Sequence, residues 1–283
     1  MSTFRFKQFT IHQEKAQMKV GTDSIILGSV IKIKSKYKRI LDVGTGTGLL
    51  SLMIAQKSSN PDITAVEIDW FSQISGKSVS KVISDLMNAG VDALPGGGAE
   101  IFSPEVRKKI CTPKTTGDSW LEIHREAHKQ GLPSNATILY GHLESYDDVI
   151  DHVSRLRDLQ DDTNGFFAFI PVLFQPFNTR LSKVKPFPFS YDLKIHSLAR
   201  LYLDNFPYIK AYWITLGEKA AQVALHYGVS DADGTIVSEK IIHDAGAKSE
   251  IGHTRDFFVK MIKDAGYLPV ERDALYNELK IYE

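Results

Sequence analysis

Three glycines separate two apolar stretches in the segment ILDVGTGTGLL, where Gly44, Gly46 and Gly48 alternate with threonines. Glycine permits positive φ angles and lets a ligand approach the backbone closely. A helix expected at 49–57 would offer unpaired N–H groups to polar or anionic atoms. This spacing is typical of loops that bind an adenosine-containing ligand, although a tight strand–helix turn without a ligand fits the same residues.

An acidic residue follows at the distance that such a site needs. The stretch ITAVEIDWF predicts a buried strand that ends with Glu67 and Asp69. Glu67, about 20 residues after the glycines, could accept hydrogen bonds from both ribose hydroxyls. Asp42 would orient the loop or the amino-acid part of the ligand. The pattern fits S-adenosylmethionine (SAM) better than a dinucleotide, and the residues expected to bind it are Asp42, Gly44, Thr45, Gly46, Gly48 and Glu67.

Alternating strands and helices must position these residues. Because short loops join the units, the alternation implies a parallel sheet. The predicted strands are 39–44, 63–68, 91–95, 134–142, 166–174 and 209–216, with 4–11 as a further candidate. The predicted helices are 22–33, 49–57, 78–90, 118–131, 147–162, 193–206, 218–228, 238–246 and 254–266. A closed eight-stranded barrel would need one or two more strands.

Composition limits the classes of protein to consider. The 283 residues are enough for one large α/β domain or two smaller ones. The single cysteine, Cys111, excludes a disulfide framework and any multi-cysteine zinc or iron–sulfur site within one chain. Because the longest apolar runs are short and broken by charge, we expect no signal peptide or membrane segment, and a soluble cytoplasmic protein.

Charge is unevenly distributed along the chain. Residues 1–62 hold 10 Lys and Arg against 4 Asp and Glu, and residues 63–283 hold 24 against 30. The basic cluster KIKSKYKR (32–39) could contact phosphates or form a solvated loop before a strand. No aromatic platform accompanies it, which favours the loop and argues against a nucleic-acid partner.

The N-terminal part resembles a known family. The stretches FRFKQFTIHQEKAQMKVGTDSIILGS, ILDVGTGTGLLSLMIAQ and ITAVEID, within residues 4–69, look like the start of the bacterial valine-tRNA adenine-N6 methyltransferases. The resemblance implies SAM binding at the glycine loop, with Lys19 and Asp23 near the cofactor. That family also needs Asn-Pro-Pro followed by Phe or Tyr. Because no NPP occurs in this sequence, base methylation has no visible catalytic group.

Residues 64–283 resemble a second family, the aminofutalosine synthases, which are radical-SAM enzymes of the futalosine route to menaquinone. The resemblance is carried by stretches such as NAGVDALPGGGAEIFSPEVRKKIC, HVSRLRDLQDDTNGFFAFIPVLFQP and LDNFPYIKAYWITLG. It implies a (βα) barrel with SAM and substrate at the carboxyl ends of the strands. It also implies a 4Fe–4S cluster held by Cys-x3-Cys-x2-Cys, and this motif is absent from the sequence.

These resemblances predict an α/β hybrid: a (βα) barrel-like parallel sheet whose first units are replaced by a Rossmann-like methyltransferase βαβ. Its two parts would be residues 1–62 and 63–283. We expect the protein to bind a small adenosyl ligand, with no metal and without complete catalytic machinery. Alternatives are a SAM-dependent tRNA adenine-N6 methyltransferase and a non-catalytic engineered or recombinant hybrid. A homodimer is expected if strand 4–11 leaves an exposed edge.

Further side chains could serve the site in the barrel part. Glu100, His142 and Gln175 follow predicted strands, so they could contact a substrate. His124 and His128 are four residues apart in HREAH, but the residue after the first histidine is Arg125 rather than the glutamate of zinc proteases, which favours an exposed helix face over a metal site.

Overall fold

The computed structural model of the chain describes residues 3–5, 10–12, 39–43, 62–66, 68–111, 114–236, 241–250 and 252–283. The chain divides into two compact units, residues 1–90 and 91–283, and each has its own packing. We expect a division at residue 62 because the family resemblance changes there, and not because the chain forms separate compact units there. That division stays a prediction.

The first unit contains a parallel strand pair. Strand β3 (Arg39–Val43) pairs with β4 (Asp62–Val66) in a register from Arg39↔Asp62 to Val43↔Val66. This confirms that the two predicted strands are parallel neighbours. Strand β4 is shorter than expected, because helix α3 (Ile68–Ser75) begins two residues after it ends. Asp69 therefore lies in the first turn of α3, where a carboxylate interacts favourably with the helix dipole, and not at a strand end.

The first unit also contains a short antiparallel strand pair and a helix. Strands β1 (Thr3–Arg5) and β2 (Thr10–His12) pair antiparallel, with Phe4 opposite Ile11, so the single strand predicted over 4–11 is wrong. The two short apolar groups face each other instead of sharing one strand. Helix α4 (Val79–Asn88) begins at Ser78, whose side chain accepts a hydrogen bond from the N–H of Lys81, as expected of an N-cap.

The second unit is built on a parallel sheet. Its strands β5 (Ser134–Tyr140), β6 (Phe166–Leu173) and β7 (Tyr208–Ile209) are adjacent in that order. Single parallel bridges extend the sheet on both sides, from Leu94 to Ser134 and from Lys210 to Asp231. Five chain segments thus run parallel, which confirms the predicted α/β class with a barrel-like parallel sheet.

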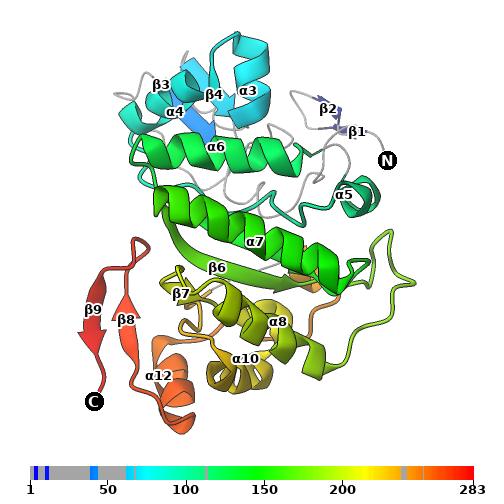
Figure 1. Ribbon diagram of the computed structural model, residues 1–283, viewed down its shortest axis with the longest axis vertical. Helices are drawn as coiled ribbons and strands as arrows, with labels where there is room; N and C mark the ends of the chain where they lie inside the picture. The colour runs from blue at the N-terminus through cyan, green and yellow to red at the C-terminus, as the bar shows by residue number, and fades with distance from the viewer. Residues whose placement is uncertain are drawn as a thin grey trace. The chain divides into compact units, whose positions relative to one another are not determined.

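Helices cover one face of this sheet. Helices α6 (Gly117–Lys129) and α7 (Tyr146–Thr163) lie side by side along it, and α8 (Phe189–Tyr202) follows (Figure 1). Helix α7 begins with a capping box formed by Ser145 and Asp148 and ends at Asn164 in a left-handed conformation. The smaller helices are α5 (Pro104–Ile110), α9 (Trp213–Leu216), α10 (Glu218–Ala224), η1 (Leu225–Tyr227), α11 (Ile241–Asp244) and α12 (Arg255–Asp264).

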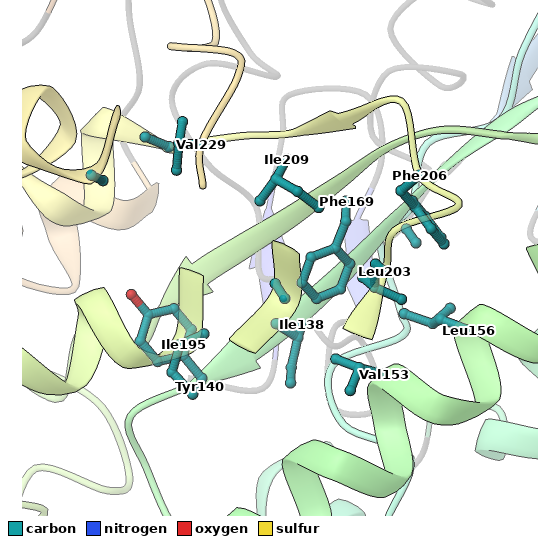
Figure 2. Close-up of a cluster of buried hydrophobic side chains, with 14 of the residues drawn as sticks. Ile138, Tyr140, Val153, Leu156, Phe169, Ile195, Leu203, Phe206, Ile209 and Val229 are labelled. Atoms are coloured by element: carbon teal, nitrogen blue, oxygen red, sulfur yellow. The ribbon is translucent and has the colours of Figure 1, made fainter. Parts of the chain in front are cut away.

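The core of the second unit lies between the sheet and these helices. Residues of β5 alternate between buried and partly exposed, so Ile138 and Tyr140 point into the core. Figure 2 shows Ile138 near Val153 of α7 and Phe169 of β6, and Tyr140 near Ile195 of α8. Complete burial of such side chains contributes about 1.5–3 kcal/mol each. This packing fixes the direction in which the carboxyl ends of the strands point.

Two predicted strands of the second unit are shorter than expected, and several elements were not predicted. The strand predicted over 91–95 is reduced to the single bridge at Leu94. The strand predicted over 209–216 is reduced to β7, because Trp213 to Leu216 form α9. Trp213 is fully buried. Helix α5 was not predicted from the sequence, nor was the antiparallel hairpin of β8 (Val270–Arg272) and β9 (Glu278–Ile281). No helix in the described part of the chain has the length and apolar character needed to cross a membrane.

The turn of this hairpin is anchored at the amino-terminal ends of the sheet strands. The ring of Tyr276 stacks on Tyr208 of β7 with 4.8 Å between centroids, and it lies 5.2 Å from the ring of Phe167 of β6. Its hydroxyl donates to Oδ1 of Asn135 in β5 at 3.3 Å. One aromatic side chain thus contacts the beginnings of three neighbouring strands.

Candidate functional site

The carboxyl ends of the parallel segments in the second unit meet at one edge, and four loops begin there. They follow Leu94, β5, β6 and β7. Ligands of parallel α/β sheets bind at this edge, because the loops that follow the strands converge there. This edge is therefore the candidate functional site of the second unit.

The first loop is held by a buried arginine. The guanidinium of Arg107, 7% exposed, donates to the backbone carbonyls of Gly98, Ala99, Ile101 and Thr115. In addition, the indole N–H of Trp120 donates to the carbonyl of Gly97 at 3.1 Å. These bonds fix the backbone of the loop.

Glu100 is the charged residue that this loop presents. It adopts a φ of 48°, and its carbonyl accepts a hydrogen bond from the N–H of Leu139 in β5 at 2.7 Å. Its carboxylate pairs with Lys114, and the two side chains are 19% and 28% exposed. Glu100 therefore lies at the carboxyl edge as expected, as part of an ion pair that solvent can still reach.

The second loop, Gly141 to Glu144, is organised around a carboxylate. Gly141 has a φ of 85°, which favours glycine. The carboxylate of Glu144 accepts hydrogen bonds from the N–H groups of Gly141 and His142 at 2.5 and 2.8 Å, and from the hydroxyl of Tyr191 at 3.1 Å. Burial raises the pKa of Glu144, but hydrogen bonds from His142 and the backbone outweigh burial and hold this pKa below its ordinary value.

The imidazole of His142 is enclosed within the same loop. Its Nε2 donates to the carbonyl of Leu139 at 2.9 Å, and its Nδ1 lies 2.9 Å from Oε2 of Glu144. The side chains of His142 and Glu144 are completely buried, and Phe174 contacts the imidazole edge-on. His142 thus holds the loop in the described structure, and a contact with substrate stays a prediction.

The third loop follows β6 and carries Gln175. Its amide donates to the carbonyl of Thr215 in α9 at 2.9 Å. The hydroxyl of Thr215 accepts a hydrogen bond from the N–H of Leu173 at 3.3 Å. Gln175 is partly exposed, so it lies at the edge and also joins the end of β6 to α9.

A pocket of about 330 Å³ adjoins the second loop. Its walls include Tyr146, Phe187, Tyr191 and Lys194, and Glu144 borders it. The rings of Phe187 and Tyr191 stack at 4.5 Å. The aromatic segment KPFPFSY thus contributes to the rim of a cavity. A pocket with aromatic walls and a few polar groups suits a small organic ligand.

Behind the second loop, three buried polar side chains lie between β5 and α8. Among the described residues, the hydroxyl of Tyr140, Oδ1 of Asp192 and Nε2 of His196 make no hydrogen bond of close geometry, although the Tyr140 hydroxyl interacts with the Asp192 carboxyl group. Burial raises the pKa of Asp192 to about 6, partly opposed by the neighbouring Tyr140 hydroxyl. A carboxyl group with this pKa exchanges its proton near neutral pH. These residues were missed in the sequence, because no local motif marks them.

The structure brings some predicted site residues together. Glu100, His142 and Gln175 follow three neighbouring segments of one sheet, and their side chains form hydrogen bonds or ion pairs with other residues rather than with one another in the described structure. In the first unit, Asp42 lies in β3 opposite Ala65. The other predicted residues, Lys19, Asp23, Gly44, Thr45, Gly46, Gly48 and Glu67, lie outside the described residues.

The residues present do not fit an iron–sulfur cluster. Such a site needs three cysteine thiolates, and the sequence holds Cys111 alone. Burial raises the pKa of this thiol, which disfavours the thiolate form that binds metals. The described residues contain no group of three or more His, Cys, Asp or Glu side chains that could hold a metal ion.

His124 and His128 do not occupy an exposed helix face, so that interpretation is wrong. Both face the core, where each accepts or donates a hydrogen bond with the hydroxyl of Ser134 at 2.8 Å. Trp120 stacks on His124 at 3.7 Å, and Phe166 contacts His128 edge-on. Burial lowers the pKa of His124 to about 3 and that of His128 to about 4, so both are neutral.

Comparisons with known proteins agree with the resemblance of the larger part. A family model described as the CofH/MqnC C-terminal region matches residues 163–283. The aminodeoxyfutalosine synthase of Thermus thermophilus is 47% identical over 243 residues, which are 83% of this chain and 65% of that protein. The first three relatives are matched over 65%, 66% and 60% of their lengths, so the chain spans about two thirds or less of each.

Further relatives broaden the comparison. The 5-amino-6-(D-ribitylamino)uracil–L-tyrosine 4-hydroxyphenyl transferase of Methanopyrus kandleri is 39% identical over 82% of this chain and 66% of that protein. The crystal structure of methylornithine synthase shares the fold, with a TM-score of 0.50, 14% identity, and coverage of 89% of this chain and 74% of the other.

Another relative is matched over more than two thirds of its length. The cyclic dehypoxanthine futalosine synthase of Halalkalibacterium halodurans is 31% identical, over 89% of this chain and 72% of that protein. A match of this extent is too long to be confined to residues 63–283, so it also includes part of residues 1–62. No comparison tests the methyltransferase resemblance. The similarity to these synthases, together with the matched C-terminal region, shows that the chain belongs to the CofH/MqnC family.

Proposed function

We propose that the chain is a futalosine-pathway relative of the aminofutalosine synthases that binds a small adenosyl ligand and does not form a substrate radical by itself. Three relatives are named for products of the futalosine type, which supports the choice of pathway. The observation that carries the second half of the proposal is the single cysteine, which cannot supply the three thiolates of a 4Fe–4S cluster.

The adenosyl ligand is assigned to the strand pair of the first unit. Strands β3 and β4 run parallel and end at the paired residues Val43 and Val66. The predicted ligand-binding residues Gly44 and Glu67 come directly after this pair in the sequence. Loops that follow adjacent parallel strands leave from the same edge, which is where such ligands bind. SAM would supply an activated methyl or adenosyl group there.

The substrate is assigned to the carboxyl edge of the second unit. The partly exposed ion pair of Glu100 and Lys114 and the amide of Gln175 offer charged and hydrogen-bonding groups at this edge. Glu144 and His142 fix the backbone of the second loop at this edge. These groups would bind and orient a polar small molecule, which agrees with the small-molecule chemistry named for the relatives.

Calorimetry of the full chain with SAM and with its demethylated product tests ligand binding. We expect heat of binding with at least one of them, and loss of that heat in Glu67→Ala, because the ribose would lose its acceptor. Asp69→Asn is the matched control, since this residue lies in the first turn of α3. No heat with either ligand would remove the adenosyl part of the proposal.

Anaerobic reconstitution with iron and sulfide tests the absence of the cluster. We expect less than one iron bound per chain and no change in Cys111→Ser, because one thiol is too few for the cluster. About four irons per chain would contradict the proposal.

Methyl transfer to tRNA is the second candidate, favoured by the glycine segment after β3. An assay with labelled SAM and valine tRNA should show no transfer, because the NPP motif is absent. Transfer above the level of a reaction without protein would favour that candidate instead.

A further inference from the structure

The C-terminal hairpin exposes apolar side chains that would be buried if a further strand or helix covered it. Leu279 is 62% exposed, Ile281 is 52% exposed and Val270 is 41% exposed. Val270 and Ile281 are partners in the register, so they lie on the same face. Two-stranded hairpins are marginally stable until a further strand or helix covers them. The exposed apolar residues therefore indicate an interaction surface.

The outer edge of β9 is the side that faces away from β8. Within the described part of the chain the sheet has two strands, so no third strand lies beside β9. The N–H of Tyr282 donates to the carbonyl of Pro269 across the hairpin, and Lys280 pairs with Glu271. Since backbone groups of an antiparallel strand alternate between its two edges, the N–H and C=O of Ile281 point away from β8.

Leu279 is the extra residue of a bulge in β9. The register passes from Glu271↔Lys280 to Arg272↔Glu278, which leaves Leu279 without a partner on β8. Leu279 therefore makes no cross-strand pair within the hairpin, and its side chain is exposed.

The charges beside Leu279 are self-complementary. Glu278 precedes it and Lys280 follows it. They lie opposite Arg272 and Glu271 of β8, and Lys280 also lies over the ring of Tyr282 at 4.5 Å, but neither forms an ion pair within 4.0 Å among the described residues. If a second copy of the strand pairs antiparallel about Leu279, Glu278 of each copy faces Lys280 of the other. Opposite charges directly across two strands are stabilising, and a two-fold axis repeats the pair.

We propose that β9 pairs antiparallel with β9 of a second copy of this chain, with Leu279 at the two-fold axis. Two hairpins then form one four-stranded sheet, and the apolar residues of both become continuous. The contact involves few residues, so the dimer is weak and its population depends on concentration. The proposal is independent of the ligand and of the absent cluster.

Sedimentation of the full chain over a series of concentrations tests the proposal. The native chain should show a reversible monomer–dimer equilibrium. Leu279→Glu and Leu279→Lys should each weaken dimerisation by about tenfold or more, since two like charges then meet at the axis. An equimolar mixture of the two variants should restore the dimer, because the introduced carboxylate of one copy then meets the introduced ammonium of the other.

Leu201→Lys is the matched control, because Leu201 on α8 is 79% exposed and lies outside the hairpin. It should leave the dimer unchanged. A chain that stays monomeric at every concentration overturns the proposal. A dimer that survives both Leu279 variants also overturns it, as does failure of the mixture to restore dimerisation.

Discussion

Gly96 and Gly97 are neighbours in the first loop, and alanine should have opposite effects at the two positions. A Cβ atom on Gly96 would lie 2.6 Å from the carbonyl oxygen of Asn135 and 2.8 Å from its carbonyl carbon. Both are backbone atoms of β5, so neither can rotate away. A Cβ atom on Gly97 would meet nothing within 4 Å. Neither glycine has a positive φ, so the contact alone distinguishes them.

The magnitude follows from the bonds that the contact would disturb. Gly96→Ala must move the segment around Leu94 away from β5, where hydrogen bonds join Leu94 to Pro133 and Asn135, and the Thr137 hydroxyl to the Gly96 carbonyl. Loss of two such bonds at about 1 kcal/mol each, with about 1 kcal/mol of overpacking, lowers the free energy of unfolding by about 3 kcal/mol. Gly97→Ala should raise it by about 0.5 kcal/mol, because alanine reduces the entropy of the unfolded chain.

Urea unfolding followed by tryptophan fluorescence measures both effects. Trp120 is a suitable reporter, because its indole donates to the carbonyl of Gly97. Equal midpoints for the two variants, or a lower midpoint for Gly97→Ala than for Gly96→Ala, would refute the inferred close approach of the loop to β5.

Three other outcomes follow from buried polar groups. Arg107→Lys should lower the free energy of unfolding by about 2–3 kcal/mol in urea titrations, because an ammonium cannot reach the four carbonyls that the guanidinium bonds. Lys108→Gln, on the exposed side of the same helix, should leave it unchanged. Burial lowers the pKa of His152 to about 3, so the unfolded chain binds a proton below about pH 6.5 that the folded chain does not, and stability should fall on acidification. His152→Gln should flatten that slope, and an unchanged slope would contradict the assignment. Burial raises the pKa of Asp192 to about 6, so between pH 4 and 6 the folded chain binds a proton at this carboxyl group that the unfolded chain does not. The stability of the native chain should therefore fall as pH rises from 4 through 6. The free energy of unfolding of Asp192→Asn, measured relative to that of the native chain, should therefore rise by about 3 kcal/mol between pH 4 and 7 in the same titrations. A difference that does not change with pH would contradict the raised pKa of Asp192.

The elements that the sequence predicted well have strong local signals. The helices predicted over 118–131 and 147–162 correspond to α6 and α7, whose ends are marked by the capping residues Thr116, Ser145 and Asn164. The strand predicted over 209–216 was wrong, because a short apolar run does not distinguish a strand from a buried helix. There the chain stays in the sheet through Lys210, which bridges Asp231, and then turns into α9.

The candidate site was predictable where chain position decides it. Glu100, His142 and Gln175 follow strands, so their common edge could be inferred from parallel pairing. The residues that contact one another around this site could not be inferred, because they are distant in sequence. Glu144 and Tyr191, for example, are 47 residues apart. The histidines of HREAH show a similar limit. Their helical spacing is visible in the sequence, but the hydroxyl of Ser134 that accompanies their burial comes from the following strand.

The anchoring of Tyr276 has a consequence for the order in which the second unit assembles. Its hydroxyl meets Asn135 across 141 residues of chain, so the contact closes a very long loop. Loop closure over such a distance is entropically costly and slow, so this contact should form late in folding. During synthesis, the starts of β5, β6 and β7 would leave the ribosome long before the aromatic ring that caps them. In a nascent chain the amino-terminal ends of these three strands would therefore be uncovered. During that interval chaperones would bind the sheet, or it would associate prematurely with other chains.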